Sequence, residues 1–230
     1  MICEVSMNRT TSPLSVGSDN GTAVLDSEQE ILGSEEALPA TVGTNIVVAK
    51  FLITGAASLL MNNPAAMAEQ DASKDDVVVG RKKIPSPEEE SKAKVYRLDP
   101  SDDFSQLYIP TTSFRSALIG ACTGRKIGKY AASTIIKGAV FTVDQVAVLF
   151  DPKTREKITK YQIDRRRVVI NRTAAVMRSR PLIPAWACEI EFEIDRDFIP
   201  DLRHVESLLN IAGRIKGVGD FRPECGGEFG

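Results

Sequence analysis

The residues best suited to chemistry are cations gathered in the second half of the chain. Residues 153–180 hold ten lysines and arginines against two acids, a local net charge of +8, although the whole chain has a formal net charge of -2. Such local concentration of charge predicts a polyanionic partner better than the overall charge does. The ten cations are Lys153, Arg155, Lys157, Lys160, Arg165, Arg166, Arg167, Arg172, Arg178 and Arg180.

Several of these cations alternate along two predicted strands of a hairpin, residues 165–171 and 174–180. Arg165 and Arg167 occupy alternate positions of the first strand, so both project from one side of it. Arg178 and Arg180 do the same on the second strand. Arginine binds phosphate through two hydrogen bonds, so a ribbon lined by guanidinium groups can follow a phosphate backbone. Tyr161, next to the basic run, is placed to stack a base.

The same arginines have an alternative use within the protein. Glu189, Glu191 and Glu193 alternate along a later predicted strand and form an acidic face. Cross-strand ion pairs between such faces are common, and each contributes little to stability. Three carboxylates neutralise only part of a region with a net charge of +8, so we favour nucleic acid as the partner.

A glycine-rich segment, residues 217–230, follows the last predicted helix. A phosphate-binding loop of the dinucleotide type lies between a strand and a following helix, and here no helix follows. The glycines either let backbone amides approach a phosphate chain or simply end the helix and turn the chain, and composition does not choose between these alternatives.

Residues for catalysis or metal binding do not converge in the sequence. His204 is the one histidine, and it falls off the apolar stripe of its predicted helix, which favours a surface position. The glutamates of residues 189–193 are more typical of a solvated strand face than of a divalent-cation site. Ser113, Ser116 and Ser133 have no general base nearby. We therefore expect no enzyme activity, no metal and no cofactor.

Composition predicts a globular core preceded by an acidic arm. Hydrophobic residues make up 43% and charged residues 26% of the chain. Residues 1–43 are rich in Ser, Thr, Gly and acids, so we expect them to be disordered. The chain begins without a secretory signal, and residues 46–61 are too polar and too few to cross a membrane. Without a CxxC pair, Cys122 and Cys188 predict reduced core thiols and a cytoplasmic location.

The elements that must position these residues follow from hydrophobic periodicity. We expect strands at 46–53, 107–110, within 138–150 and at 186–195, the first of them largely buried on both faces with Lys50 pointing to one surface. Helices are expected from Pro87 to Tyr96, from Thr111 or Thr112 as cap to Cys122, and at 201–212. Between them we expect a tight loop at 58–64, an insertion loop at 65–92 and a basic hairpin at 153–182. Two helices among antiparallel strands predict one α+β domain over residues 44–230, with a modified ferredoxin-like core.

Three segments of this chain resemble the RAMP (repeat-associated mysterious protein) superfamily of CRISPR effector subunits, and above all its small phage- and prophage-encoded relatives. Residues 46–53 and the loop to Met61 are similar to the family's first strand and loop. Residues 108–118, YIPTTSFRSAL, look like its "I-P-x-S-S-x-K-x-A-L-R" helix entry. Residues 213–230 are similar to the glycine-rich loop that closes the fold.

The resemblance implies a core like that of RNA-recognition motifs, an inserted hairpin and binding of single-stranded nucleic acid by subunits aligned along the strand. It places Ser113 and Arg115 in the helix-entry motif. The residues that it places in the phosphate-binding terminal loop are Gly217, Gly219, Arg222, Gly226 and Gly227. We add the nearby cations Arg125 and Lys126 to the expected contacts. Cleaving members keep a histidine that this chain lacks, and the family's last strand usually continues beyond the position of Gly230.

Three hypotheses follow. The first is a non-catalytic protein that binds single-stranded DNA or RNA, as a homo-oligomer or within a nucleoprotein complex, with no membrane partner. The second is a metal-independent endoribonuclease of the RAMP type, with His204 or a tyrosine as base. The third is a phage structural or interaction protein whose Arg and Glu faces join neighbouring subunits.

Overall fold

The computed structural model describes residues 4–8, 45–64, 85–170 and 174–230. Most of the predicted acidic arm, most of the predicted insertion loop and Arg172 lie outside these ranges. Residues 4–8 belong to the segment predicted to be disordered, but they form strand β1 (Glu4–Asn8). This part of the prediction was wrong because composition favoured disorder over the whole segment, whereas β1 forms by antiparallel pairing with residues 50–54, which are distant in the sequence.

The larger sheet is built around strand β11 (Ala187–Asp195). On one side β11 pairs with β2 (Ile46–Thr54), which in turn pairs with β1. On the other side β11 pairs with β7 (Val140–Thr142) and β8 (Val146–Phe150), and β8 pairs with β4 (Tyr108–Pro110). Every pairing is antiparallel, as the predicted α+β class requires.

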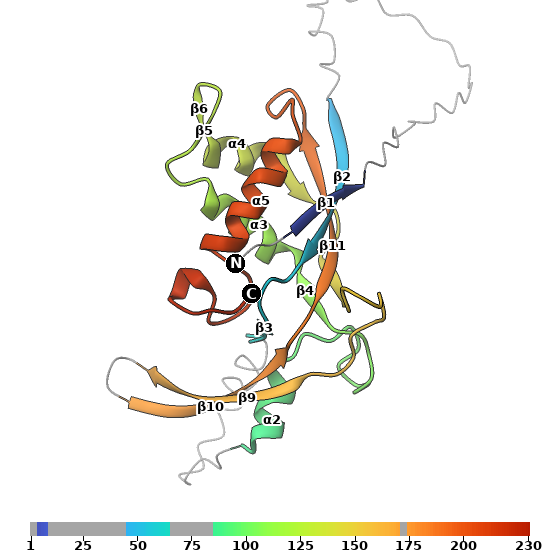
Figure 1. The fold of residues 1–230 in the computed structure, drawn as a ribbon, viewed down its shortest axis with the longest axis vertical. Helices are drawn as coiled ribbons and strands as arrows, with labels where there is room; N and C mark the ends of the chain where they lie inside the picture. The colour runs from blue at the N-terminus through green and yellow to red at the C-terminus, as the bar shows by residue number, and fades with distance from the viewer. Residues whose placement is uncertain (1–3, 9–44, 65–84, 171–173) are drawn as a thin grey trace, which may run out of the picture.

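Three helices cover one face of this sheet: α3 (Thr111–Ala121), α4 (Ala132–Ala139) and α5 (Arg203–Ile215) (Figure 1). Their apolar stripes pack against alternate residues of the strands, including Phe51 of β2 and Phe192 of β11, which are fully buried. The other face is open, and the outward residues of β2 are exposed or half-buried there. The prediction that residues 46–53 are buried on both faces was therefore wrong.

A separate three-stranded sheet contains the predicted basic hairpin. Its strands β9 (Gln162–Ile170) and β10 (Ala174–Ile183) pair antiparallel, and β3 (Leu59–Leu60) pairs with β10. Figure 1 shows this hairpin extending from one end of the molecule, with helix α2 (Pro87–Lys94) against it. The hairpin and α2 are confirmed, but α2 ends at Lys94, and the predicted tight loop at 58–64 contains β3.

One local prediction was wrong and three elements were missed. Helix α3 has no side-chain cap: Pro110 is its N-cap, and the Thr111 hydroxyl donates instead to the Asp144 carbonyl. Helix α4 and the short hairpin before it, β5 (Lys126–Ile127) and β6 (Tyr130–Ala131), were not predicted.

The described chain closes with a 3-10 turn η2 (Pro223–Cys225) in the glycine-rich tail. None of the helices in the described ranges combines the length and apolar character that a membrane span requires. The structure thus has the predicted coarse class, a mixed antiparallel α+β fold, while the ferredoxin-like core stays a prediction.

Candidate nucleic-acid interface

The register of the β9–β10 hairpin sorts its arginines onto two faces. Arg166 lies directly opposite Arg178, and Asp164 lies opposite Arg180. Residues directly opposite each other in an antiparallel pair project to the same side. Arg166, Arg178 and Arg180 therefore share one face with an aspartate, and Arg165 and Arg167 project from the other.

Arg180 is buried in an ion pair with the glycine-rich tail. Its Nε lies 2.7 Å from Asp220 Oδ2, and its side chain is 9% exposed. The guanidinium also lies 5.2 Å from the centre of the Phe221 ring, a cation–π contact. Neither Arg180 Nε nor Nη1 has an aligned hydrogen-bond acceptor among the described residues. Arg180 thus joins hairpin and tail, and it is not available to bind phosphate as predicted.

Arg166 is held on the same face by its neighbour and by the tail. It donates two hydrogen bonds to Asp164, at 2.5 and 2.6 Å. Its guanidinium lies over the rings of Phe229 (4.6 Å) and Phe221 (5.4 Å). The hydrogen bond to Asp164 raises the pKa of Arg166 despite the opposing effect of burial. Arg166 is therefore also paired, contrary to its predicted role.

Arg178 contacts helix α2 through Glu90. The Glu90 carboxylate accepts hydrogen bonds from Lys94, from the Ser179 backbone and from Arg178, at 2.6, 2.8 and 3.2 Å. Burial alone would raise the pKa of Glu90, but these donors outweigh burial and hold the pKa below its usual value. Glu90 thus binds the backbone of β10 at Ser179, outside the part of β10 that pairs with β3, and Arg178 contributes to this contact.

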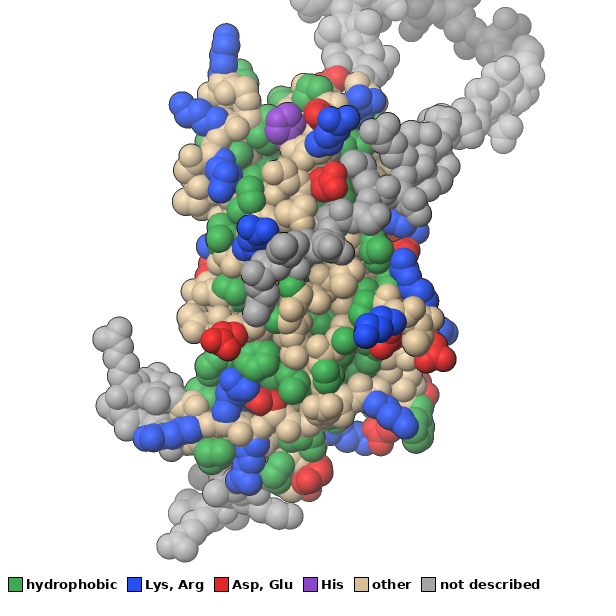
Figure 2. Space-filling view, viewed as in Figure 1, with side chains coloured by type: hydrophobic (Ala, Val, Ile, Leu, Met, Phe, Trp, Pro, Cys, Tyr) green, Lys and Arg blue, Asp and Glu red, His purple; other side chains and the backbone are tan. Residues whose placement is uncertain are grey.

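Arg165 and Arg167 remain on the opposite face, and both are exposed. No ion pair or hydrogen bond links either side chain to another described residue. Met177 and Ile163 are also large and exposed on this face, at 51% and 41%. Figure 2 shows cationic side chains at this end of the molecule. The face thus combines two free guanidinium groups with apolar surface.

The two predicted contacts before the hairpin differ. Lys160 is exposed, as a phosphate contact requires. Tyr161 is half-buried and packs against the hydrophobic core, and burial raises the pKa of its hydroxyl. Its ring is therefore not free to stack a base, and that prediction was wrong.

The acidic row on β11 has other partners. Lys50 lies 3.0 Å from Glu191 and 3.5 Å from Glu189, and Arg155 lies 3.4 Å from Glu189. The hydrogen bond that Lys50 donates to Glu191, together with the negative charge of Glu191, raises the pKa of Lys50. This row therefore does not neutralise the hairpin arginines, which pair instead with the carboxylates Asp164, Glu90 and Asp220.

The glycines of the tail serve mainly to fold it. Gly219 has φ +80°, and a Cβ there would lie 2.6 Å from the Leu60 carbonyl oxygen; a Cβ on Gly227 would overlap the Phe221 carbonyl. Asp220 N–H donates to the Leu60 carbonyl at 2.8 Å, which attaches the tail to β3. Gly226 also has a positive φ. These contacts support the plain-turn alternative.

A polar cavity nevertheless adjoins part of the tail. It has a volume of about 450 Å³ and lies between the first turns of α3 and residues 217–224. Gly217, Gly219 and Arg222 line it, whereas Gly226 and Gly227 do not. Arg222 is partly committed, because it hydrogen-bonds the Gly219 carbonyl and pairs with Glu224. The structure thus brings the two predicted motifs, helix entry and glycine loop, to one cavity, with Ser113 among its lining residues.

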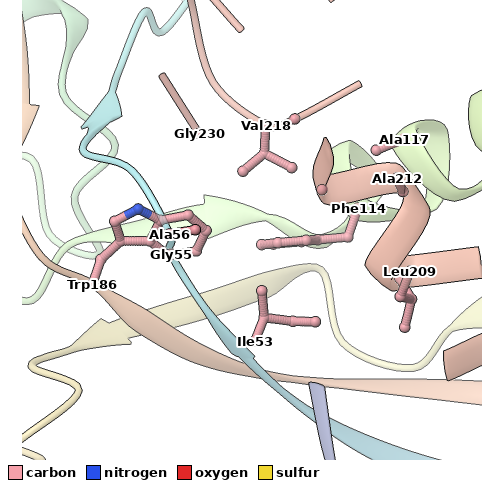
Figure 3. Close-up of a pocket in the computed structure, with 12 residues that line it drawn as sticks. Ile53, Gly55, Ala56, Phe114, Ala117, Trp186, Leu209, Ala212, Val218 and Gly230 are labelled. Carbon is pink, nitrogen blue, oxygen red and sulfur yellow. The ribbon is translucent and has the colours of Figure 1, made fainter. Parts of the chain in front are cut away.

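A second hollow is apolar and small (Figure 3). Trp186 and Phe114 lie on its walls together with Ile53, and its volume is about 30 Å³, room for a single water or methyl group. No charged side chain lines it. This hollow is a packing feature between sheet and helices.

Three predicted nucleic-acid contacts remain: Arg115, which is bonded within the fold, and Arg125 and Lys126, which are exposed. Arg115 donates to the carbonyl oxygens of Val140 and Lys137, both at 2.8 Å, and its guanidinium lies 5.2 Å from the Phe141 ring centre. It thus holds the end of α4, and a role in phosphate binding is not what its contacts indicate. Arg125 is exposed with one bond to the Ala121 carbonyl, and Lys126 is exposed.

The groups that a catalytic or metal site needs are dispersed in the described ranges. His204 is exposed, and its Nδ1 lies 3.2 Å from the Asp201 carbonyl. Within those ranges, no three His, Cys, Asp or Glu side chains are grouped so that they could hold a metal ion.

Comparison of this chain with models of known protein families, with curated proteins and with solved structures finds no match. The resemblance to RAMP proteins therefore stays an expectation from the three motifs. The feature of this chain that most favours a function is the β9–β10 hairpin, above all its two arginines that have no partner among the described residues.

Proposed function

We propose that the protein binds single-stranded nucleic acid, without catalysing a reaction, through the outer face of the β9–β10 hairpin. The observation that carries the proposal is the contrast within one hairpin. Arg166, Arg178 and Arg180 each have a carboxylate partner, whereas Arg165 and Arg167 are exposed and unpaired among the described residues.

The arrangement of this face favours a single strand as the ligand. Alternate residues of a strand lie about 7 Å apart, so Arg165 and Arg167 can contact one continuous chain of phosphates. Exposed Met177 and Ile163 on the same face offer apolar surface to unpaired bases. Duplex bases are stacked inside the helix and could not use that surface.

The paired arginines have a supporting role in this proposal. Arg180 and Arg166 fasten the hairpin to the tail, and Arg178 fastens it to α2 through Glu90. A hairpin held from both sides keeps its outer face in one orientation, which lowers the entropy lost on binding. The interface is therefore smaller than the ten cations of the sequence predict.

The family and the compartment belong to the same proposal. The antiparallel α+β core with an attached hairpin supports a RAMP-like, modified ferredoxin-like protein. Cys122 is buried and Cys225 is exposed, and neither forms a disulfide with a described residue, which suits a reducing cytoplasm.

Self-association is a second candidate function, favoured by the position of β9. It ends the three-stranded sheet, so one edge of its backbone has no strand partner among the described residues. Such edges pair readily with another chain. An oligomer that forms without nucleic acid, and that a proline at an outward N–H of β9 disperses, would support this function.

Fluorescence anisotropy with labelled single-stranded DNA and RNA tests the main proposal. The variant is Arg165→Gln/Arg167→Gln, and the matched control is Arg203→Gln/Arg214→Gln, which removes two equally exposed arginines from α5. Two lost charge-assisted contacts predict affinity roughly 10- to 100-fold weaker, and the control is expected to change affinity less than threefold. Equal effects of the two variants would overturn the proposal.

The same samples distinguish binding from cleavage. We expect labelled RNA to be recovered intact after incubation without metal. Cleavage that disappears in His204→Ala would replace the proposal with the endoribonuclease hypothesis.

A further inference from the structure

A stretch of forty residues before the hairpin carries positive charge only. Residues 104–143 contain no aspartate or glutamate, although acids and bases are nearly balanced over the whole chain. Its five cations are Arg115, Arg125, Lys126, Lys129 and Lys137. Since Arg115 is bonded to backbone carbonyls inside the fold, the surface charge belongs to the other four.

The β5–β6 hairpin presents two of these four cations, Lys126 and Lys129, on a projecting element. Its two strands pair only with each other, and the turn between them contains Gly128 with φ +58°. Lys126 and Lys129 are exposed, and neither makes an ion pair or side-chain hydrogen bond with another described residue. No acid of the same stretch is present to neutralise them.

An exposed aromatic side chain directly follows Lys129 in the chain, at the start of β6. Tyr130 is 65% exposed, the second most exposed large apolar side chain in the described part of the chain. A single exposed aromatic is common on protein surfaces. An exposed ring and two unpaired lysines on one short hairpin, however, are the groups with which proteins stack unpaired bases and hold their phosphates.

The base of this hairpin is anchored, so its tip has a defined position. Ile127 packs against the hydrophobic core, and the Ala132 N–H donates to the Arg125 carbonyl at 3.0 Å. Helix α4 follows at once, with Ile135 and Ile136 buried. The tip therefore projects from a rigid support and is not a loose loop.

The two hairpins lie toward opposite ends of the molecule along its longest axis (Figure 1). Cationic side chains appear near both ends in the space-filling view (Figure 2). A compact chain of this length is roughly 40 Å across. At about 3.4 Å per stacked nucleotide, one strand of about 12 nucleotides spans that distance.

We propose that the β5–β6 hairpin is a second contact for the same strand, with Tyr130 stacking a base and Lys126 and Lys129 binding phosphates. This inference rests on the proposed function of the β9–β10 hairpin. A short oligonucleotide then engages one hairpin at a time, whereas a long one engages both. The second contact is intramolecular once the first has formed, so long strands gain affinity.

Anisotropy titrations with a labelled 6-mer and a labelled 24-mer of deoxythymidine test the inference. The variant is Lys126→Gln/Lys129→Gln/Tyr130→Ala, and the control is Arg203→Gln/Arg214→Gln, two exposed arginines of α5 outside both hairpins. A long oligonucleotide offers more positions at which a protein can bind than a short one does. Comparing variant with wild type at the same oligonucleotide length removes this difference. We expect the variant to bind the 24-mer at least about tenfold more weakly than wild type and the 6-mer within about threefold. Tyr130→Phe keeps the ring and is expected to retain the wild-type affinity.

The outcomes separate this inference from the proposed function. An unchanged 24-mer affinity in the triple variant overturns the second contact while leaving the first in place. An equal loss for both lengths also overturns it, because the β5–β6 hairpin would then be part of every complex. If the wild type binds neither the 6-mer nor the 24-mer, both proposals are overturned.

Discussion

The ion pair between Arg180 and Asp220 makes a strong prediction about stability. Asp220→Asn preserves the size of the side chain and removes the charge that faces a guanidinium 2.7 Å away. Removing one partner of a buried pair costs about 3–5 kcal/mol, because the other charge is left uncompensated. The Arg180 side chain is 9% exposed, but that of Asp220 is 26% exposed, so water compensates in part. We therefore expect a loss near the low end, about 3 kcal/mol.

Urea denaturation followed by tryptophan fluorescence measures this loss. Trp186 is the single tryptophan and is buried, so its emission reports on the core. A loss of about 3 kcal/mol corresponds to a decrease of roughly 6–12 °C in melting temperature for a chain of this size. Glu228→Gln, at an exposed position of the same tail, is the control and is expected to change stability by less than about 0.5 kcal/mol.

A double variant identifies the cause of the loss. Arg180→Met removes the buried charge, so adding Asp220→Asn to it is expected to cost at least about 1 kcal/mol less than Asp220→Asn alone. Two results would contradict this account: a free energy of unfolding of Asp220→Asn within about 0.5 kcal/mol of that of wild type, or losses of the two single variants that simply add in the double variant. Either result would mean that Arg180 does not depend on Asp220 and that the division of the arginines into paired and free is wrong.

Three further predictions concern other contacts. Gly55→Ala places a Cβ into the Trp186 indole, so we expect a loss of about 1–3 kcal/mol in urea denaturation. Glu90→Gln is expected to lower the free energy of unfolding by about 2 kcal/mol at neutral pH. Because the pKa of Glu90 is lowered in the folded protein, this stability difference from wild type should shrink as the pH falls below about 4.5 and through the lowered pKa. A stability difference that stays constant with pH would contradict this prediction. Arg115→Met should lose about 1–2 kcal/mol of stability yet change oligonucleotide affinity less than twofold.

Periodicity alone predicted much of the fold. Alternation identified the strand that ends at Asp195, and apolar spacing identified α3 and α5. Helix α4 shows how a signal can be present and be overlooked. Its buried residues Ala132, Ile135, Ile136 and Ala139 have the spacing of a helix, but the apolar, β-branched run that follows favoured strands over the whole region.

The site was predictable as a place but not residue by residue. The positions of Arg165 to Arg180 established a basic hairpin, which the structure confirms. Which of its arginines are free depends on Glu90 and Asp220, which lie 88 residues before Arg178 and 40 after Arg180. Only the folded chain brings those carboxylates to the hairpin.

The tail illustrates the same limit. Phe221 and Phe229 accept the guanidinium groups of Arg166 and Arg180 on their rings, and nothing in the glycine pattern indicates that contact. The sequence does hold one signal that we missed, the absence of acids from residues 104–143. A running charge balance along the chain would have drawn attention to the β5–β6 hairpin.

The salt dependence of oligonucleotide binding tests the central claim most directly. Each phosphate contact on a single strand contributes a slope of about -0.7 to log Kobs against log[salt], because bound counterions are released. Arg165→Gln/Arg167→Gln should therefore make the slope shallower by about 1.4, whereas Arg203→Gln/Arg214→Gln should leave it nearly unchanged. A flat response in the wild type, or one slope shared by all three proteins, would show that these two arginines do not bind phosphate.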